Sequence, residues 1–291
     1  MESSADIAPL VVLVGPTASG KSRIALQLAE KFNGEIISAD SRAIYKHLDI
    51  GTAKPTLDQL QKVPHHLIDI VEPDQPFTAA DFKQAANEAI ADVASRGKLP
   101  ILVGGTGLYV DSVIFDYTFL PPGDAQERER LSRLSVEALQ QLLKARGIPL
   151  PLNEHNPRHL IRRLEAGYIP TEPRQLRANT VVIGIEVEPD ELKQRIAIRV
   201  DAMFAQGLAH EATSMGERYG WQVQALQTIG YREFRAYAEG TQSLTETHDQ
   251  IVQDTISYAK RQRTWFKRNK SIQWGRNREN IEDIITTFLS K

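Results

Sequence analysis

The stretch Leu10-Val11-Val12-Leu13-Val14-Gly15-Pro16-Thr17-Ala18-Ser19-Gly20-Lys21-Ser22 decides the fold of this 291-residue chain. Its first five residues are continuously apolar, which is typical of a strand buried in a parallel sheet. The next eight match the pattern G-x-x-x-x-G-K-[ST] in full, and apolar residues at helical spacing follow from Lys21 onward. A strand, a glycine-rich turn and a helix in this order form the context that this phosphate-binding loop requires.

The residue types of this loop suit a diphosphate or triphosphate. Its glycines let successive backbone N–H groups turn inward around an anion, and the start of the helix adds partial positive charge. Lys21 can neutralise phosphate oxygens, and the Ser22 hydroxyl is a potential Mg²⁺ ligand. The sequence therefore predicts an anion site over Gly15–Ser22, with Mg²⁺ as cofactor and Ser22 as its protein ligand.

The same strand-then-helix order repeats along the chain and predicts an α/β fold. We expect a parallel sheet flanked by helices, like that of P-loop NTPases, with strands at 10–14, 35–39, 66–71, 99–103 and 180–187. Further helices are expected at 78–97, 189–206 and 248–268 and from about 280. Residues 119–178 offer helices only, one of them marked by Asn156, Pro157 and Gly167. We expect a catalytic core of residues 1–118 and 179–291, with 119–178 as an inserted helical subdomain.

Composition excludes several classes of protein. No apolar run approaches the roughly 18 residues that a membrane span needs. With 35 Lys and Arg against 37 Asp and Glu, the formal charge of −2 gives no global argument for nucleic-acid binding. The chain has no cysteine and so no disulfide, thiol nucleophile or cysteine-based zinc site. The acidic N-terminus before a short apolar run does not suit a signal peptide, so we expect a cytoplasmic protein.

Two acidic residues near strand ends are candidates for chemistry. Asp40 directly follows the strand 35–39, at the sheet edge where ligands of open α/β folds bind, but Asp40-Ser41 would also suit an Asx turn. Asp69, within the expected strand 66–71, could hold a metal or be structural. The strand 99–103 instead runs into Gly104-Gly105, with no carboxylate at the place where a nucleotide hydrolase or kinase would supply one. The phosphate loop therefore need not mean ATP.

Local basic clusters suggest a second, polyanionic substrate despite the balanced net charge. Six cations lie within eleven residues that contain no acid: Lys260, Arg261, Arg263, Lys267, Arg268 and Lys270. A second basic stripe, at helical spacing, consists of Arg158, His159, Arg162 and Arg163. Each could also be a solvated helix face, but phosphate contacts favour such clusters.

Several motifs together resemble the tRNA dimethylallyltransferases, also called tRNA isopentenyltransferases. They run in order over nearly the whole chain: Gly15–Ser22, Ser38-Ala39-Asp40-Ser41 with Tyr45, Asp49–Pro55, Pro64–Asp69, Gly104–Tyr109, Ile229-Gly230-Tyr231, and Tyr258–Gln262 with Trp265-Phe266. The resemblance implies transfer of a prenyl group from dimethylallyl diphosphate to N6 of the adenosine at position 37 of a tRNA anticodon loop.

The resemblance also implies roles for particular residues. Asp40 is similar to the family's catalytic base, Thr17 to a loop threonine near the reacting centre, and Arg199 to an arginine that binds pyrophosphate. The residues implied in tRNA binding are Asp40, Ser41, Arg42, Ala43, Thr106, Arg158, His159, Leu160, Ile161, Arg162, Gln227, Gly230, Tyr231 and Arg232. Many relatives carry Gln where this chain has Ala43, and often Arg or Gln near His159, which affects individual base contacts.

Three alternatives remain open at the level of sequence. An adenylate isopentenyltransferase would share the loop and the acidic residue, although a mononucleotide needs no extended basic track. A P-loop kinase is disfavoured by Gly104-Gly105, and a noncatalytic RNA-binding module by the complete phosphate loop. No symmetric interface is visible, so we expect a monomer. From the absence of a long apolar run, we also expect no membrane partner.

Overall fold

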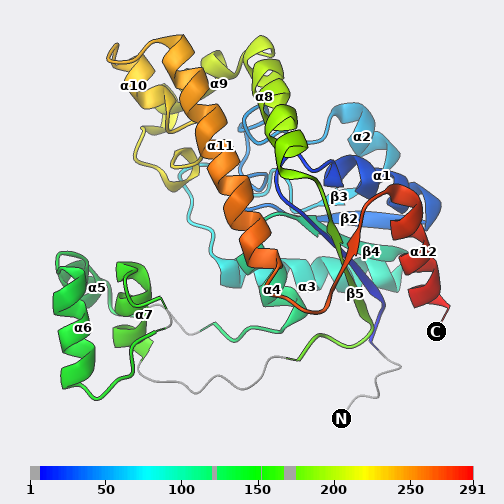
Figure 1. Cartoon of the computed structure of the whole chain (residues 1–291), viewed down its shortest axis with the longest axis horizontal. Coiled ribbons are helices and arrows are strands. Elements are labelled where there is room, and N and C mark those ends of the chain that lie inside the picture. The colour runs from blue at the N-terminus through cyan, green and yellow to red at the C-terminus, as the bar shows by residue number, and fades with distance from the viewer. Residues whose placement is uncertain (1–6, 120–122, 152, 167–174, 291) are drawn as a thin grey trace. The chain divides into compact units, whose positions relative to one another are not determined.

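The computed structural model describes residues 7–119, 123–151, 153–166 and 175–290 (Figure 1). Contacts divide the chain into two compact units, one formed by residues 1–116 and 176–291 and the other by residues 117–175. The sequence placed an insertion at 119–178, within three residues of these limits at each end.

A six-stranded, wholly parallel sheet forms the centre of the larger unit, in the order β3-β2-β4-β1-β5-β6. The strands are β1 (Leu10–Val14), β2 (Gly34–Ala39), β3 (His65–His66), β4 (Leu99–Gly104), β5 (Thr180–Ile185) and β6 (Ile272–Gly275). This confirms the predicted fold class. The edge strand β6 was not predicted, because its four residues carry no apolar run.

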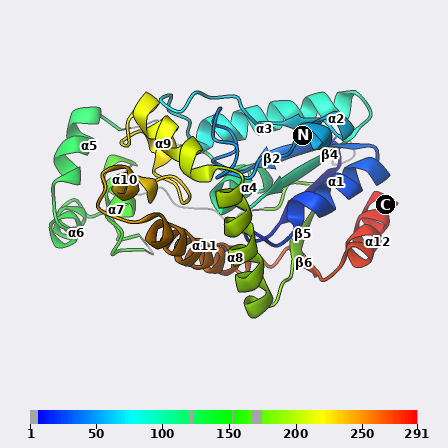
Figure 2. The ribbon, with the colours of Figure 1, turned by 90° about the horizontal axis from the view of Figure 1, so that it is seen from above.

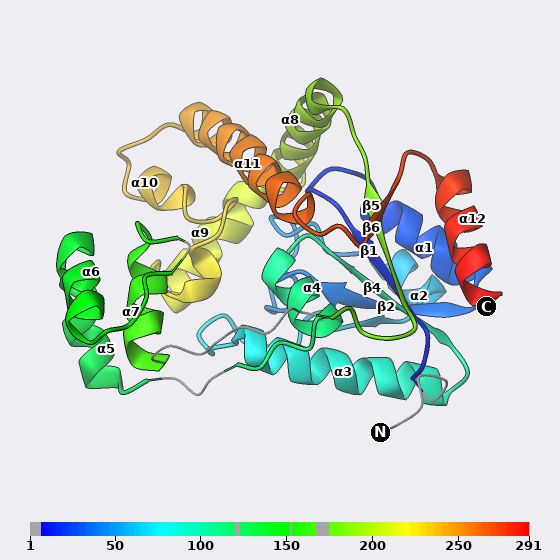
Figure 3. The same ribbon diagram turned by 60° about the horizontal axis from the view of Figure 1, so that its bottom comes forward.

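Helices cover both faces of this sheet. In the larger unit they are α1 (Lys21–Lys31), α2 (Leu57–Lys62), α3 (Ala79–Ser95), α4 (Gly107–Ile114), α8 (Pro189–Ala205), α9 (Leu208–Tyr219), α10 (Phe234–Ala238), α11 (Leu244–Phe266) and α12 (Arg278–Leu289). Figures 1 and 3 show α1 and α12 on one face and α3 and α4 on the other. Within the described ranges, no helix has the length and apolarity needed to cross a bilayer.

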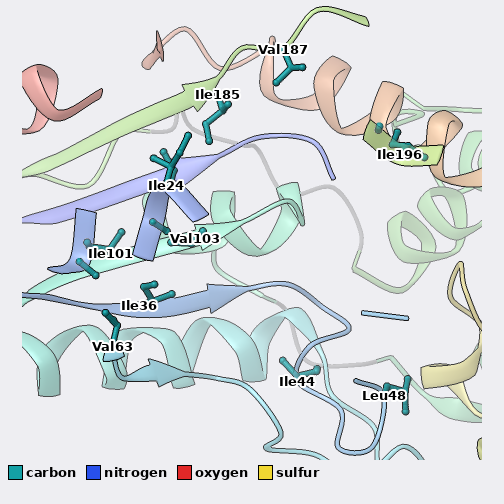
Figure 4. Packing of buried hydrophobic residues seen from close by; sticks show 14 of the residues in the cluster. Ile24, Ile36, Ile44, Leu48, Val63, Ile101, Val103, Ile185, Val187 and Ile196 are labelled. Atoms are coloured by element: carbon teal, nitrogen blue, oxygen red, sulfur yellow. The ribbon is translucent and has the colours of Figure 1, made fainter. Parts of the chain in front are cut away.

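The central strand β1 packs against both helical layers. Val11 and Leu13 belong to the core that includes Ile24 of α1, part of which Figure 4 shows. Leu10, Val12 and Val14 belong to the opposite core, with α3 and α4. Alternate side chains of a strand point to opposite faces, so a strand buried on both faces must be apolar throughout. This explains the continuous run in the sequence.

Capping boxes set the starts of two long helices. The Thr78 hydroxyl accepts a hydrogen bond from the backbone N–H of Asp81, so Thr78 caps α3 at the position where the sequence predicted this helix to begin. Ser243 and Glu246 form the same arrangement at α11, so this helix begins at Leu244, four residues before the predicted His248.

The expected strand 66–71 is wrong in the structure. Only His65 and His66 pair with β2, and the backbone then turns left-handed at Leu67 (φ +62°) and Asp69 (φ +56°). Asp69 lies in this loop and accepts a hydrogen bond of 2.5 Å from Lys54 Nζ. Since Asp69 does not line the cleft described below and is paired with a lysine, the structural interpretation of this residue holds in place of the metal-binding one.

The described residues of the smaller unit form three helices with an apolar core of their own. Its helices are α5 (Ala125–Ser132), α6 (Val136–Ala145) and α7 (Pro157–Ala166). They bury five leucines, namely Leu131, Leu139, Leu143, Leu160 and Leu164. Arg128 of α5 makes a two-pronged ion pair with the carboxylate of Glu165 of α7, at 2.6 and 2.7 Å. The expected helix stop Gly167 lies outside the described residues.

Candidate active site

A cleft of about 380 Å³ opens at the carboxyl edge of the sheet in the larger unit. Residues that follow three neighbouring strands line it, as expected for an open α/β fold. The segments that line the cleft are the phosphate loop with α1 (Thr17, Lys21, Ser22), the turn after β2 (residues 40–43), the loop 51–55, α8 (Arg199), the segment 227–230, and α11 (Tyr258, Arg261, Gln262).

The phosphate loop closes tightly before α1. Gly20 adopts φ +86° at the position just before the helix, a left-handed conformation that glycine adopts without strain. A Cβ atom added at Gly15 would lie 2.9 Å from Ser19 Oγ, so the loop has no room for a side chain there. Lys21 Nζ donates to the carbonyl of Pro16 at 3.3 Å, which holds the ammonium group over the loop.

Lys21, Arg199 and Asp40 form an electrostatic cluster in this cleft. Burial, together with the positive charge of Arg199, lowers the pKa of Lys21 to about 8, against an opposing effect from Asp40. Burial also lowers the pKa of Arg199, again opposed by Asp40. With both cations protonated, two positive charges face one negative charge. A cluster of this kind attracts an anion, because binding relieves the cost of confining two like charges.

Helix α8 brings a second arginine to the phosphate loop. Arg195 lies one turn before Arg199 and donates from Nη1 to the carbonyl of Ser19 at 3.3 Å. Its Nη2 donates to Glu191 Oε1 at 2.6 Å. The i, i+4 spacing of the two arginines was the available signal in the sequence, and only Arg199 was predicted to matter. Helix α8 packs against α11, as Figure 2 shows.

Asp40 combines the two roles that the sequence left open. Its Oδ1 accepts from the backbone N–H groups of Arg42 (2.9 Å) and Ala43 (3.4 Å), which is an Asx turn. The residue also lines the cleft, and its Oδ2 accepts no hydrogen bond from the part of the chain that the structure describes. The turn therefore fixes the carboxylate by one oxygen and leaves the other available to a ligand.

Gln262 of α11 holds the phosphate loop against the end of β4, which sequence reasoning missed. Its Oε1 accepts from the backbone N–H of Thr17 at 2.8 Å, and its Nε2 donates to the carbonyl of Gly105 at 2.9 Å. The side chain is buried, and a Cβ at Gly105 would lie 2.3 Å from Nε2. Gly104 is equally constrained, since its Cβ would lie 2.2 Å from the Ala39 carbonyl. This strand end has no space for the carboxylate that a kinase would need.

Thr106 joins the end of β4 to the turn that carries Asp40. Its Oγ1 accepts from the backbone N–H of Ser41 at 3.1 Å and donates to Ser41 Oγ at 3.3 Å. Burial raises the pKa of Tyr258 on α11 to about 12, and the Asp40 carboxylate adds to this shift. Tyr258 is therefore a neutral hydrogen-bonding group beside Asp40 at ordinary pH.

The residues predicted to bind tRNA, apart from Thr106 described above, fall into three groups. Six of them line the cleft together with Asp40: Ser41, Arg42, Ala43, Gln227, Gly230 and Arg232. Leu160 and Tyr231 are buried, so their side chains present no surface to a tRNA in this structure. The exposed Arg158 and His159 lie on α7 with Ile161 and Arg162, in the smaller unit.

Two of the cleft-lining cations are held by other groups. Arg42 Nη1 donates to the carbonyl of Gln224 at 3.2 Å. Arg232 pairs with Glu233 at 2.8 Å and with Asp254 at 2.6 Å. Both side chains are therefore positioned before any ligand arrives.

The basic segment of α11 and its extension form an exposed cationic face. Lys260, Arg261, Lys267, Arg268 and Lys270 are exposed, and no ion pair joins any of these five to an acid among the described residues. The opposite side of this segment carries the buried residues Gln262 and Phe266. The segment thus has one packed face and one cationic face.

Comparison with known proteins identifies the family. The family model described as IPP transferase matches residues 43–269. A tRNA dimethylallyltransferase of Anoxybacillus flavithermus is 43% identical over 91% of this chain and 89% of its own length. That of Bacillus subtilis is 39% identical over 91% and 90%.

Solved structures agree with this result. The tRNA isopentenylpyrophosphate transferase of Bacillus halodurans superposes with a TM-score of 0.77 at 38% identity and covers 98% of this chain and 97% of its own. A eukaryotic dimethylallyltransferase acting on tRNA has the same TM-score at 27% identity, over 89% of this chain and 70% of its own. By sequence and by fold, this chain belongs to the IPP transferase family.

Proposed function

We propose that this protein is a tRNA dimethylallyltransferase, which moves a dimethylallyl group from dimethylallyl diphosphate to N6 of the adenosine at position 37 and releases diphosphate. One observation carries the proposal: a single cleft places the Lys21–Arg199 cation pair beside a carboxylate with a free oxygen. The family match, with relatives named for this activity, supports it.

The cation pair suits a departing diphosphate. As the allylic C–O bond breaks, negative charge gathers on the leaving group, and preorganised donors stabilise that charge. In our proposal, Lys21, Arg199 and the N–H groups of the loop that are not already bonded within the protein, as those of Thr17 and Ser19 are, supply such donors. Thr17, fixed through its N–H by Gln262, lines the cleft, and we assign its hydroxyl a place near the reacting centre.

Mg²⁺ fits the same place as a cofactor. The exposed hydroxyl of Ser22 lines the cleft in the first turn of α1, and Mg²⁺ is commonly held by one or two protein oxygens together with phosphate oxygens and water. Bound there, the ion would neutralise charge on the diphosphate. We propose Ser22 as its ligand from the protein.

Asp40 suits the acceptor side of the reaction. The exocyclic amine of adenine is a weak nucleophile, because its lone pair is conjugated with the ring. As N6 bonds to the allylic carbon and the C–O bond to diphosphate breaks, a proton leaves N6, and a positioned carboxylate can accept it. We assign this role to Asp40, whose Asx turn aims the carboxylate while Oδ2 takes the proton.

A tRNA substrate explains the exposed cations of α11. The target base must leave its stack to reach the cleft, so neighbouring surfaces have to bind the anticodon stem-loop. The exposed face of Lys260–Lys270 and the cleft-lining Arg42 and Arg232 are suited to phosphates. We propose that the basic residues of α7 contribute as well, and that the protein acts as a cytoplasmic monomer.

Neutralising this cationic face tests the tRNA contact. The double variant Lys267→Gln/Arg268→Gln should weaken stem-loop binding and reduce the slope of log Kd against log salt by about 1–2. Fluorescence anisotropy at several salt concentrations measures this slope. Lys62→Gln, an exposed lysine of α2, is the matched control. An unchanged slope in the double variant would rule out phosphate contacts at these residues.

A labelling assay separates the proposed activity from its alternatives. Labelled dimethylallyl diphosphate is offered with an anticodon stem-loop carrying A37, with the same stem-loop carrying G37, and with AMP. A fourth reaction contains labelled ATP and candidate small-molecule acceptors. We expect label on the A37 stem-loop alone. Label on AMP alone would establish the adenylate alternative, and phosphate transfer from ATP would establish a kinase.

A further inference from the structure

Glu211 of α9 accepts hydrogen bonds from two separate loops and does not itself line the cleft. Its carboxylate accepts from three consecutive backbone N–H groups, those of Asp49 (3.0 Å), Ile50 (2.9 and 3.0 Å) and Gly51 (3.1 Å). It also accepts from the hydroxyl of Tyr231 at 2.6 Å. Four donors on one partly buried carboxylate are charge-assisted bonds, stronger than those between neutral groups.

The first of these loops forms part of the cleft wall. Residues 51–55 line the cleft that contains Asp40, while the backbone just before them is bound to Glu211. Lys54 completes the loop by donating to the carbonyl of Tyr45 (2.7 Å) and to Asp49 (2.7 Å). The wall is therefore held by two charged groups, Glu211 on α9 and Lys54 within the loop itself.

The second loop touches the first directly. Tyr231 is fully buried, and a Cβ atom at Gly51 would lie 2.4 Å from its ring. Gly230 adopts φ +91°, and its Cβ would lie 3.6 Å from the Gly51 carbonyl oxygen. No side chain separates the two loops. Burial, with the neighbouring Glu211 charge, raises the pKa of Tyr231, which therefore keeps the proton that it donates.

We propose that Glu211 is a positioning residue that fixes the cleft wall formed by residues 51–55 and 227–230, against which the acceptor nucleoside is placed. This inference rests on the proposed function, because it concerns the same cleft. Glu211 touches no reacting atom. It acts by holding the two loops in register, and a shift of about 1 Å in such a wall can lower the rate about 100-fold.

The chemistry of the contact predicts graded effects. In Glu211→Gln, an amide N–H₂ group replaces one acceptor oxygen and faces N–H donors, so that side of the contact becomes repulsive. We expect kcat/KM for the stem-loop to fall roughly 10- to 100-fold. Tyr231→Phe removes one hydroxyl and leaves three of the four donors, and should lower it by roughly 3- to 10-fold. Combining the two should give less than the product of the single effects, because they act on one carboxylate.

The test combines kinetics with a measurement that needs no activity. Kinetics are run well below the unfolding temperature of each variant, and pyrophosphate affinity is measured separately. Affinity for pyrophosphate should stay within about twofold of wild type, because the loop 15–22 is not held by Glu211. Hydrogen exchange of the peptide around residues 49–51 should accelerate in Glu211→Gln. The control is Glu217→Gln, an exposed glutamate on the same helix, which should behave as wild type.

The possible results separate this inference from the proposed function. If wild type transfers no prenyl group to any stem-loop, the proposed function fails, and hydrogen exchange alone decides whether Glu211 holds the wall. If wild type is active and both Glu211→Gln and Tyr231→Phe match it, the positioning role is overturned. Equal loss of pyrophosphate affinity and turnover in Tyr231→Phe would also overturn it, because the effect would then be general.

Discussion

The two ends of strand β2 carry charged groups arranged in opposite ways. At its start, Glu35 is 4% exposed and is held by a two-pronged ion pair with Arg96 and by a 2.8 Å contact with His66 Nε2. Hydrogen bonding by Arg96 lowers the pKa of Glu35 to about 2. Just past its end, Asp40 lies with Lys21 and Arg199 in the open cleft.

The difference separates a structural cluster from a site prepared for a ligand. At Glu35 the carboxylate is fully paired with Arg96 and His66 within the protein. At Asp40 one carboxylate oxygen is free and the cations exceed the anions, so the cluster is completed only when an anion binds. The charges are paired at the start of β2 and are left with excess positive charge just past its end, because different segments pack around the two ends.

The cluster of Asp40, Lys21 and Arg199 is called the open cluster below. Removing its proton acceptor, Asp40, should have the largest effect on turnover. Asp40→Ala and Asp40→Asn should each lower kcat roughly 10²- to 10⁴-fold, because neither side chain can accept a proton from N6. Asparagine retains an oxygen that can accept from Arg42 and Ala43, so it keeps the Asx turn. Diphosphate affinity should be unchanged or tighter, since a negative charge is lost.

Single-turnover kinetics and calorimetric titration with diphosphate measure the two quantities separately. Asp40→Asn with near wild-type turnover would show that Asp40 serves the turn alone. Equal loss of binding and turnover in both variants would also indicate a structural aspartate.

Loosening the scaffold of the open cluster should have a smaller effect. Gln262→Met keeps the side-chain volume but removes both hydrogen bonds, to Thr17 and to Gly105. Since two buried backbone groups lose their partners, we expect diphosphate affinity to fall about tenfold. Titration calorimetry measures it, with Gln253→Met on the exposed side of α11 as control. Equal affinities in the two variants would contradict a role for Gln262 in holding the loop.

The charge state of the open cluster predicts a pH dependence. The pKa of Lys21 is lowered to about 8, so the ammonium is present below this pH and is lost above it. Diphosphate affinity should therefore decrease several-fold between about pH 7 and pH 9, as the cluster loses one positive charge. Lys21→Arg should flatten the decrease, because an arginine stays protonated in this range. An identical slope in both proteins would show that Lys21 does not titrate there.

A change in the cluster of Glu35, Arg96 and His66, called the closed cluster, should affect stability and leave activity unchanged. The pKa of Glu35 is lowered from 4.5 to about 2, so its contribution is present above about pH 4.5 and disappears as the pH falls toward 2. Because Arg96 is 41% exposed and water screens the pair, we expect Glu35→Gln to lose roughly 1–2 kcal/mol at pH 7.

Urea unfolding at several pH values measures this contribution, and the difference from wild type should shrink below pH 4. A lowered kcat in Glu35→Gln under folded conditions would remove the distinction between the two ends of β2.

What the sequence could predict depended on distance along the chain. The strand, loop and helix over residues 10–31 were predictable, because the apolar run, the glycines and the lysine lie within a short segment. The contact of Gln262 with Thr17 joins residues 245 positions apart, and that of Arg195 with Ser19 joins residues 176 apart. No local pattern marks such contacts. The failure at residues 66–71 has another cause, because left-handed backbone at Leu67 and Asp69 interrupts an apolar run that alone resembles a strand.

Helix α11 also links the two layers of the larger unit mechanically. Its residues Ile251 and Ala259 belong to the core on one face of the sheet, and Phe266 belongs to the core on the other. Detaching the helix would expose apolar surface of both cores, so its local opening should cost more free energy than that of a segment packed on one core alone. A segment that carries cleft residues and exposed cations is thereby anchored in both layers.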